Sequence, residues 1–160
     1  MTVCGKGLFF YAELVLRHAL TFWNNWSHVN NNNNAGHPSR GNIRWARPES
    51  GRLKLNTDAS LDASTESMSL GWVLRDHEGV FLAAKNMHLQ GIYTVNKAEA
   101  IGLREALSWL KGMGMGGVDV EMDSQNVFYS LSNPSFSSTF GIIIDDVKEL
   151  TSMIDNVKFF

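Results

Sequence analysis

The sequence has little of what marks several classes of protein. It contains a single cysteine, Cys4, so no disulfide can form within the chain. No apolar run reaches the roughly 18–20 residues of a membrane-spanning helix. The nearest candidate, residues 7–26, is interrupted by Glu13 and Arg17. A clean apolar stretch with a small-residue cleavage site, which would indicate secretion, is also lacking. The sequence indicates no membrane partner, and it does not identify the compartment, whether intracellular, nuclear or cytoplasmic.

An excess of positive charge is lacking too. The 160 residues include 14 Lys and Arg against 16 Asp and Glu, a net charge of −2. A strongly basic chain would have indicated electrostatic clamping of nucleic acid. Residues 1–43 carry a net charge of +2 and residues 44–160 a net charge of −4. Apolar residues make up 44% of the chain, which is ordinary for a folded globular protein.

Composition divides the chain into a leader, residues 1–43, and a patterned domain, residues 44–160. Apolar and aromatic residues over 8–27 predict one short helix in the leader. Residues 30–42 hold five consecutive asparagines followed by Gly and Pro, which is typical of a linker.

The domain alternates strand and helix patterns. Alternating apolar and polar residues over 52–58 predict a half-exposed strand, and 68–75 with 80–87 predict a hairpin. The further expected elements are a helix over 96–111 capped by Asn96, a strand over 118–122, helices over 124–131 and 140–153, and a strand starting at 157. This order predicts an α/β fold with a mixed five-stranded sheet and flanking helices. Three strands form an antiparallel meander, which a crossover extends to parallel strands.

Three carboxylates are expected to meet at one end of this sheet. Asp58 and Asp123 each stand at the carboxyl end of a strand, and the two strands are expected to run parallel, about 4.8 Å apart if they are neighbours. Glu99 lies on the first turn of the long helix, at the shoulder of its apolar stripe. Three carboxylates repel one another unless cations neutralise them, and oxygen ligands suit Mg²⁺ or Mn²⁺.

Each carboxylate also has a plainer interpretation. Most Asp and Glu side chains are solvated surface groups, and Asp123 stands next to Ser124, where a helix is expected to begin. Asp123 is therefore also a candidate helix N-cap. The spacing by itself leaves both interpretations open.

Other motifs point to no chemistry. The run Gly112–Gly117 matches G-x-G-x-x-G, but it follows a helix and precedes a strand, the reverse of the dinucleotide-binding arrangement. The five histidines are scattered, so no zinc-binding spacing is present. The sequence also lacks the nucleophile elbow of serine hydrolases.

Four motifs, in order along the chain, resemble ribonuclease H-type domains. The resemblance is closest to the plant reverse transcriptase-like domains related to the ribonuclease H of retroelements. The motifs are Trp45–Pro48 with Gly51–Ser60, Gly71–Asp76, Lys97–Ala100 and Val118–Ser124. The resemblance covers about residues 44–160 and agrees with the expected order of strands and helices.

The resemblance implies an endonuclease that hydrolyses the RNA strand of RNA/DNA hybrids. Asp58, Glu99 and Asp123 match the family's metal-binding carboxylates. Asp58 would bridge two Mg²⁺ (or Mn²⁺) ions, with Asp123 on the first and Glu99 on the second. Such ions activate a water and stabilise the leaving oxygen of a phosphodiester. The expected partner is an RNA/DNA hybrid or another nucleic acid, and no obligate protein partner is indicated. Candidate contacts with the nucleic-acid backbone are Lys54, Asn56, Ser60 and Asn126.

The sequence departs from the family at its end. The family has a fourth acidic residue on a helix beyond the fifth strand, whereas this sequence stops at Phe160, inside that strand. We therefore expect a C-terminally truncated domain. Asp145 and Asp146 are interpreted as the solvated face of the preceding helix, not as replacements. The alternative function is a catalytically silent, retroelement-derived module that binds nucleic acid or another partner.

Overall fold

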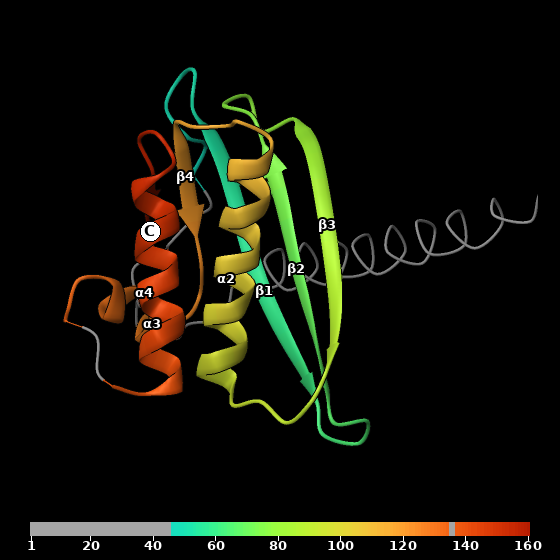
Figure 1. Cartoon of the computed structure of the whole chain (residues 1–160). Coiled ribbons are helices and arrows are strands. Elements are labelled where there is room, and N and C mark those ends of the chain that lie inside the picture. The colour runs from blue at the N-terminus through green and yellow to red at the C-terminus, as the bar shows by residue number, and fades with distance from the viewer. Residues whose placement is uncertain (1–45, 135–136) are drawn as a thin grey trace, which may run out of the picture. The chain divides into compact units, whose positions relative to one another are not determined.

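The sheet begins with an antiparallel meander of three strands (Figure 1). These strands are β1 (Leu53–Asp62), β2 (Ser67–Arg75) and β3 (Phe81–Gln90). The computed structural model describes residues 46–134 and 137–160, so the helix and linker expected within 1–43 lie outside the described residues.

After the meander the chain alternates between helices and strands. The elements are α2 (Val95–Gly112), β4 (Val118–Glu121), α3 (Gln125–Leu131), α4 (Thr139–Ser152) and β5 (Lys158–Phe159). The strands lie in the order β3-β2-β1-β4-β5, and β4 runs parallel to both of its neighbours. The predicted mixed sheet of five strands is confirmed.

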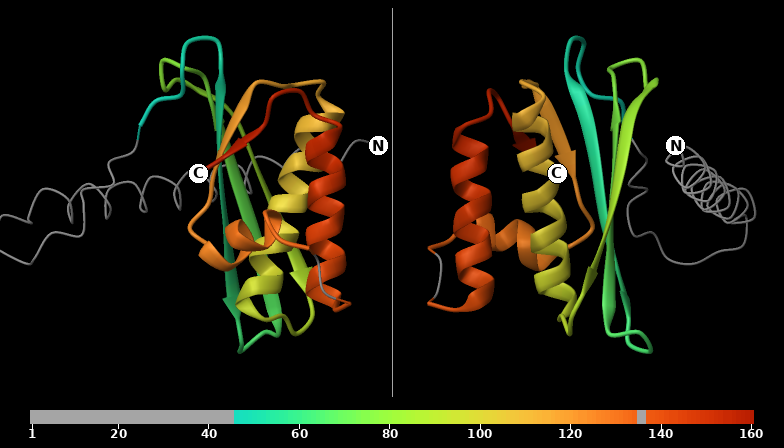
Figure 2. Two further views of the ribbon diagram at one scale, coloured as in Figure 1. Left: turned by 90° about the vertical axis from the view of Figure 1, so that its left-hand side faces the viewer. Right: turned by 45° about the vertical axis from the view of Figure 1, so that its right-hand side comes forward.

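The core lies between the sheet and α2, and the helices cover the same face of the sheet (Figure 2). Four alternate residues of β2 are at most 2% exposed: Met68, Leu70, Trp72 and Leu74. The stripe predicted on α2 is likewise buried: Ala100, Leu103, Leu107 and Leu110. The two periodicities, two in the strand and about 3.6 in the helix, therefore meet in one apolar layer.

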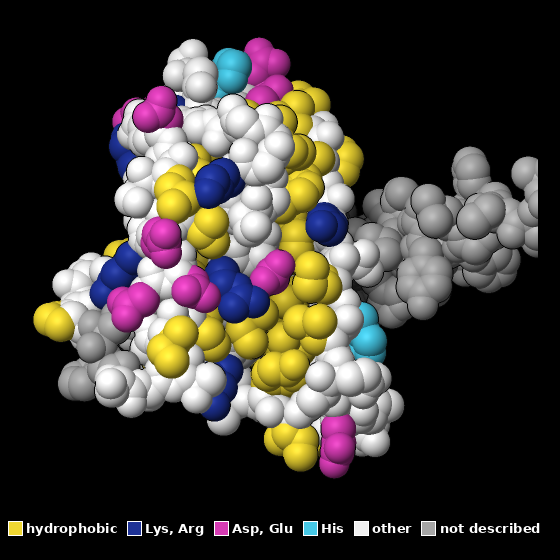
Figure 3. Space-filling view, viewed as in Figure 1, with side chains coloured by type: hydrophobic (Ala, Val, Ile, Leu, Met, Phe, Trp, Pro, Cys, Tyr) yellow, Lys and Arg dark blue, Asp and Glu magenta, His cyan; other side chains and the backbone are white. Residues whose placement is uncertain are grey.

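The outer strand β3 is only partly covered. Its residues Phe81 and Leu82 are 61% and 45% exposed, and apolar side chains gather over α2 and β3 on the face shown in Figure 3. Within the part of the chain that the structure describes, no helix is long and apolar enough to cross a membrane.

Two of the element ends that differ from the sequence prediction have a visible structural cause. β1 continues to Asp62 because it pairs with β2 as far as Ser67, beyond the point where its apolar alternation stops. Asn96 does not cap α2: Thr94 holds the extended backbone of the cap position (φ −87°, ψ 155°), and Asn96 Oδ1 accepts a hydrogen bond from Asn126 Nδ2 instead.

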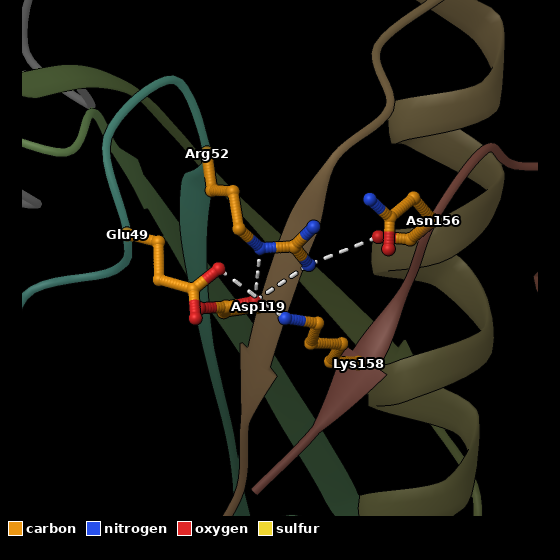
Figure 4. A network of polar contacts seen from close by, with 5 residues as sticks. All are labelled: Glu49, Arg52, Asp119, Asn156 and Lys158. Atoms are coloured by element: carbon orange, nitrogen blue, oxygen red, sulfur yellow. Dashed lines mark hydrogen bonds and ion pairs between the residues drawn. The ribbon is translucent and has the colours of Figure 1, made fainter.

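A buried ion pair joins the start of β1 to β4 (Figure 4). Arg52 Nε donates to Asp119 Oδ1 over 2.7 Å, and Arg52 Nη2 donates to the carbonyl oxygen of Asn156 over 3.0 Å. Arg52 and Asp119 are only 6% and 7% exposed. Alternation alone predicted a half-exposed strand here, but the two opposite charges allow this polar face to be covered as well.

The core position of Leu107 gives a test of this packing. Leu107 is fully buried on α2, so Leu107→Ala should leave a cavity and lower the free energy of unfolding by about 2–5 kcal/mol. Ile142→Ala on α4 is the control, because Ile142 is 63% exposed and should change that free energy by less than about 0.5 kcal/mol. Denaturant titration measures both, and equal effects would contradict the described core.

Candidate metal centre

The pairing of β1 with β4 sets the positions of two aspartates. The four paired residues run from Leu53 opposite Val118 to Asn56 opposite Glu121, a constant offset of 65 residues. Continued by two residues, the same register brings Asp123 beside Asp58. Asp58 itself lies within β1, whereas Asp123 lies two residues beyond the last residue of β4.

The helix α2 supplies the third carboxylate. Glu99 is the fifth residue of α2 and is 9% exposed, flanked by the buried Ala98 and Ala100. One carboxylate oxygen from each of Asp58, Glu99 and Asp123 lies within 4.8 Å of the others. The structure thus brings together the three acidic residues that the sequence analysis singled out.

The close approach of these groups changes their protonation. Burial, followed by the negative charges of Asp123 and Asp58, raises the pKa of Glu99 from 4.5 to about 7. Burial and then Asp123 also raise the pKa of Asp58, while a hydrogen bond from the backbone of Ala59 acts in the opposite direction on both groups. The metal-free cluster therefore retains protons that isolated carboxyl groups would have lost.

This donor set fits a divalent cation. A bound cation would remove the mutual repulsion that raises these pKa values. Carboxylate oxygens are hard ligands of the kind that Mg²⁺ and Mn²⁺ prefer. Among the described residues, this is the one group of three or more potential metal ligands within such a distance.

The plainer interpretation of Asp123 as a helix cap does not describe this structure. Ser124 is the N-cap of α3, and its side chain accepts a hydrogen bond from the backbone N–H of Val127. Asp123 is exposed beside the other two carboxylates. Asp145, which is exposed on α4, and Asp146, which pairs with Arg104 over 3.5 Å, both lie outside the cluster.

The four candidate nucleic-acid contacts occupy different surroundings. Lys54 is 6% exposed, forms an ion pair with Glu121 over 3.0 Å and donates to the carbonyl oxygen of Ala46. Asn56 is half-buried, whereas Ser60 and Asn126 are exposed. Contact of these residues with nucleic acid stays a prediction.

Sequence reasoning missed the roles of Glu121 and Arg75 near the site. Asn56 Nδ2 donates to Glu121 Oε2 over 2.7 Å, and Arg75 Nη1 donates to Asn56 Oδ1 over 3.0 Å. One signal in the sequence could have revealed this contact. Alternate residues of β4 are polar, and the parallel register of β1 with β4 places one of them, Glu121, opposite Asn56.

Comparisons with known proteins agree with this fold. The family model described as "Reverse transcriptase-like" matches residues 56–160. A search of curated proteins found no match. Among solved structures, ribonuclease H1 from the halophilic archaeon Halobacterium salinarum is 22% identical, with a TM-score of 0.59 over 69% of this chain and 86% of that one.

Two further solved structures share the fold. The N-terminal ribonuclease H domain of a Mycobacterium tuberculosis protein, solved as a fusion with maltose-binding protein, is 20% identical, with a TM-score of 0.56 over 68% of this chain and 81% of that one. LC11-RNase H1, solved in complex with an RNA/DNA hybrid, is 19% identical, with a TM-score of 0.57 over 68% and 85%.

The raised pKa of Glu99 makes the stability of the metal-free protein depend on pH. Between pH 4.5 and about 7 the unfolded chain has lost the Glu99 proton while the folded protein still holds it. In this pH range the folded state binds more protons than the unfolded state. The contribution of Glu99 to the free energy of unfolding therefore falls as pH rises. Glu99→Gln should remove this decline and raise the unfolding temperature at about pH 8.

Thermal unfolding in a chelator at about pH 5 and pH 8 measures this effect. Glu149→Gln, which changes an exposed glutamate on α4, is the matched control and should keep the pH dependence of the wild type. If Glu99→Gln kept it too, the charge repulsion described for the cluster would be wrong.

Proposed function

Because the chain belongs to the reverse transcriptase-like family and has the ribonuclease H-like fold, we propose that it is a metal-dependent ribonuclease H-type endonuclease. Its proposed substrate is the RNA strand of RNA/DNA hybrids. The observation that carries the proposal is the convergence of Asp58, Glu99 and Asp123 within 4.8 Å. A shared fold alone does not imply a reaction, whereas a site with the required donor groups supports one.

Asp58, Glu99 and Asp123 would hold two Mg²⁺ or Mn²⁺ ions through their carboxylate oxygens. When bound, such cations lower the pKa of a water molecule and stabilise the charge that develops on the leaving oxygen of a phosphodiester. Asp58 and Asp123 are exposed, so a phosphodiester can approach the cluster at these two residues, whereas Glu99 is buried. Glu99 must release its proton to become a ligand, so cation binding strengthens as pH rises toward and beyond about 7.

The choice of substrate rests on two kinds of support. LC11-RNase H1, which shares the fold, was solved in complex with an RNA/DNA hybrid. In this chain, the exposed Ser60 lies two residues beyond Asp58 and the exposed Asn126 lies three residues beyond Asp123. These polar side chains are our candidates for contact with a sugar–phosphate backbone at the cluster, and proteins recognise RNA helices through backbone shape and 2′-hydroxyls.

Cleavage of a labelled RNA/DNA hybrid tests the proposal. With Mg²⁺ or Mn²⁺ the wild-type chain should cut the RNA strand, and Asp58→Asn should slow cutting by about 100-fold or more, because several kcal/mol of metal-dependent stabilisation are lost. Asp62→Asn is the control: Asp62 lies on the same strand outside the cluster, where its Oδ1 accepts hydrogen bonds from Ser64 that an amide oxygen also accepts. Equal rates for Asp58→Asn and the wild type would contradict the proposed reaction.

A further inference from the structure

A chain of polar side chains crosses β1 immediately before the carboxylate cluster. Lys54, Asn56, Arg75 and Glu121 make up this group, which we call the Asn56 bridge. Asn56 is its centre, because it donates to Glu121 over 2.7 Å on β4 and accepts from Arg75 over 3.0 Å on β2. Lys54 adds an ion pair with Glu121 over 3.0 Å. The bridge therefore links three adjacent strands through their side chains.

The bridge stands where the backbone pairing of β1 with β4 stops. Asn56 opposite Glu121 is the last pair of that ladder, and each aspartate of the cluster comes two residues later in the sequence. Asp58 is still held by the β1–β2 ladder, opposite Gly71. Asp123 already lies beyond β4. The Asn56–Glu121 hydrogen bond is thus the side-chain link between β1 and β4 that lies nearest to the two aspartates along these strands.

The two aspartates need such a link because their charges push them apart. Two carboxylates at this separation repel each other, and a metal site binds tightly only when its ligands are already held at the correct spacing. A hydrogen bond from a neutral amide to a carboxylate restrains both strands without adding net charge to the cluster.

We propose that Asn56 and Glu121 are positioning residues, which hold Asp58 and Asp123 at the separation that a divalent cation requires. This inference rests on the proposed function, because it assigns the bridge a part in metal binding. It differs from the nucleic-acid contact expected for Asn56, because the bridge acts on the cluster in the absence of any nucleic acid.

The chain contains a matched control for this proposal. The Arg52–Asp119 ion pair, drawn in Figure 4, also joins the β1 side of the sheet to β4. It lies near the start of β4, whereas the cluster lies beyond the other end of that strand. Arg52→Lys keeps the charge and disturbs the hydrogen bonds to Asp119 and to the carbonyl oxygen of Asn156. Both Asn56→Ala and Arg52→Lys should lower the unfolding temperature, whereas only Asn56→Ala should weaken metal binding.

Binding of Mn²⁺ alone, followed by electron paramagnetic resonance without nucleic acid, is the first measurement. We expect Asn56→Ala to weaken Mn²⁺ binding by about 10–100-fold, the range typical for residues that orient metal ligands. Arg52→Lys should bind Mn²⁺ as the wild type does. If Asn56→Ala bound Mn²⁺ with wild-type affinity, or if both variants lost affinity in proportion to their stability, the proposal would be overturned.

A double variant distinguishes a specific bridge from a general loss of structure. Asn56→Asp alone places a second carboxylate against Glu121 and should weaken the link between the strands. The double variant Asn56→Asp/Glu121→Gln again has one amide and one carboxylate, and the same net charge as the wild type. In this variant the amide at position 121 donates to the carboxylate at position 56, the reverse of the wild-type hydrogen bond. Recovery of Mn²⁺ binding in the double variant supports the proposal, and the absence of recovery contradicts it. If the wild-type chain bound no Mn²⁺ at all, the proposed function itself would fail, and the inference with it.

Discussion

The parallel pairing of β1 with β4 is the constraint on which the rest of the site depends. Parallel neighbours must be joined by a crossover, and here the crossover contains α2, which runs back from the end of β3 toward the start of β4 (Figure 1). The helix therefore runs antiparallel to β4, and its N-terminal part, which includes Glu99, lies toward the carboxyl ends of β1 and β4. Glu99 meets Asp58 and Asp123 for this topological reason.

The acidic residues of β4 and the segment after it show how the domain divides its charges. Asp119, Glu121 and Asp123 stand at alternate positions, so they start from the same face of the strand. Arg52 pairs with the first and Lys54 pairs with the second. The third instead joins Asp58 and Glu99, where mutual repulsion and burial raise the pKa of Glu99 to about 7. The sheet thus compensates two negative charges internally and leaves the third in an arrangement that favours an external cation.

Local sequence patterns predicted much of this fold because they reflect local physics. The alternation in β2 and the 3.6-residue stripe of α2 each require burial on one side only, so the pattern is visible without knowing the partner. Asp58 and Asp123 could be found as candidates because the end of a strand and the direction of a crossover can be inferred from element order. The resemblance to ribonuclease H-type domains, carried by the motifs around these residues, pointed to the same three carboxylates.

Features that depend on long-range pairing were not visible in the sequence. Lys54 and Asp119 are charged and yet buried, because each pairs with an opposite charge: Lys54 with Glu121 on β4, and Asp119 with Arg52 just before β1. The extension of β1 to Asp62 follows from its pairing with β2, not from its own pattern. Asn96 has the chemistry of a helix cap, but the backbone of Thr94 determines where α2 begins.

The charge balance of the domain bears on how it would meet a polyanion. Residues 44–160 carry a net charge of −4, which repels nucleic acid at separations within about one Debye length. Two divalent cations held by the carboxylate cluster would carry four positive charges, enough to offset this excess at the very edge where a phosphodiester must approach. In the proposed function, metal binding therefore does more than supply chemistry. Because bound cations would make the local potential less negative, a domain with a net negative charge could accept a nucleic-acid backbone at this site.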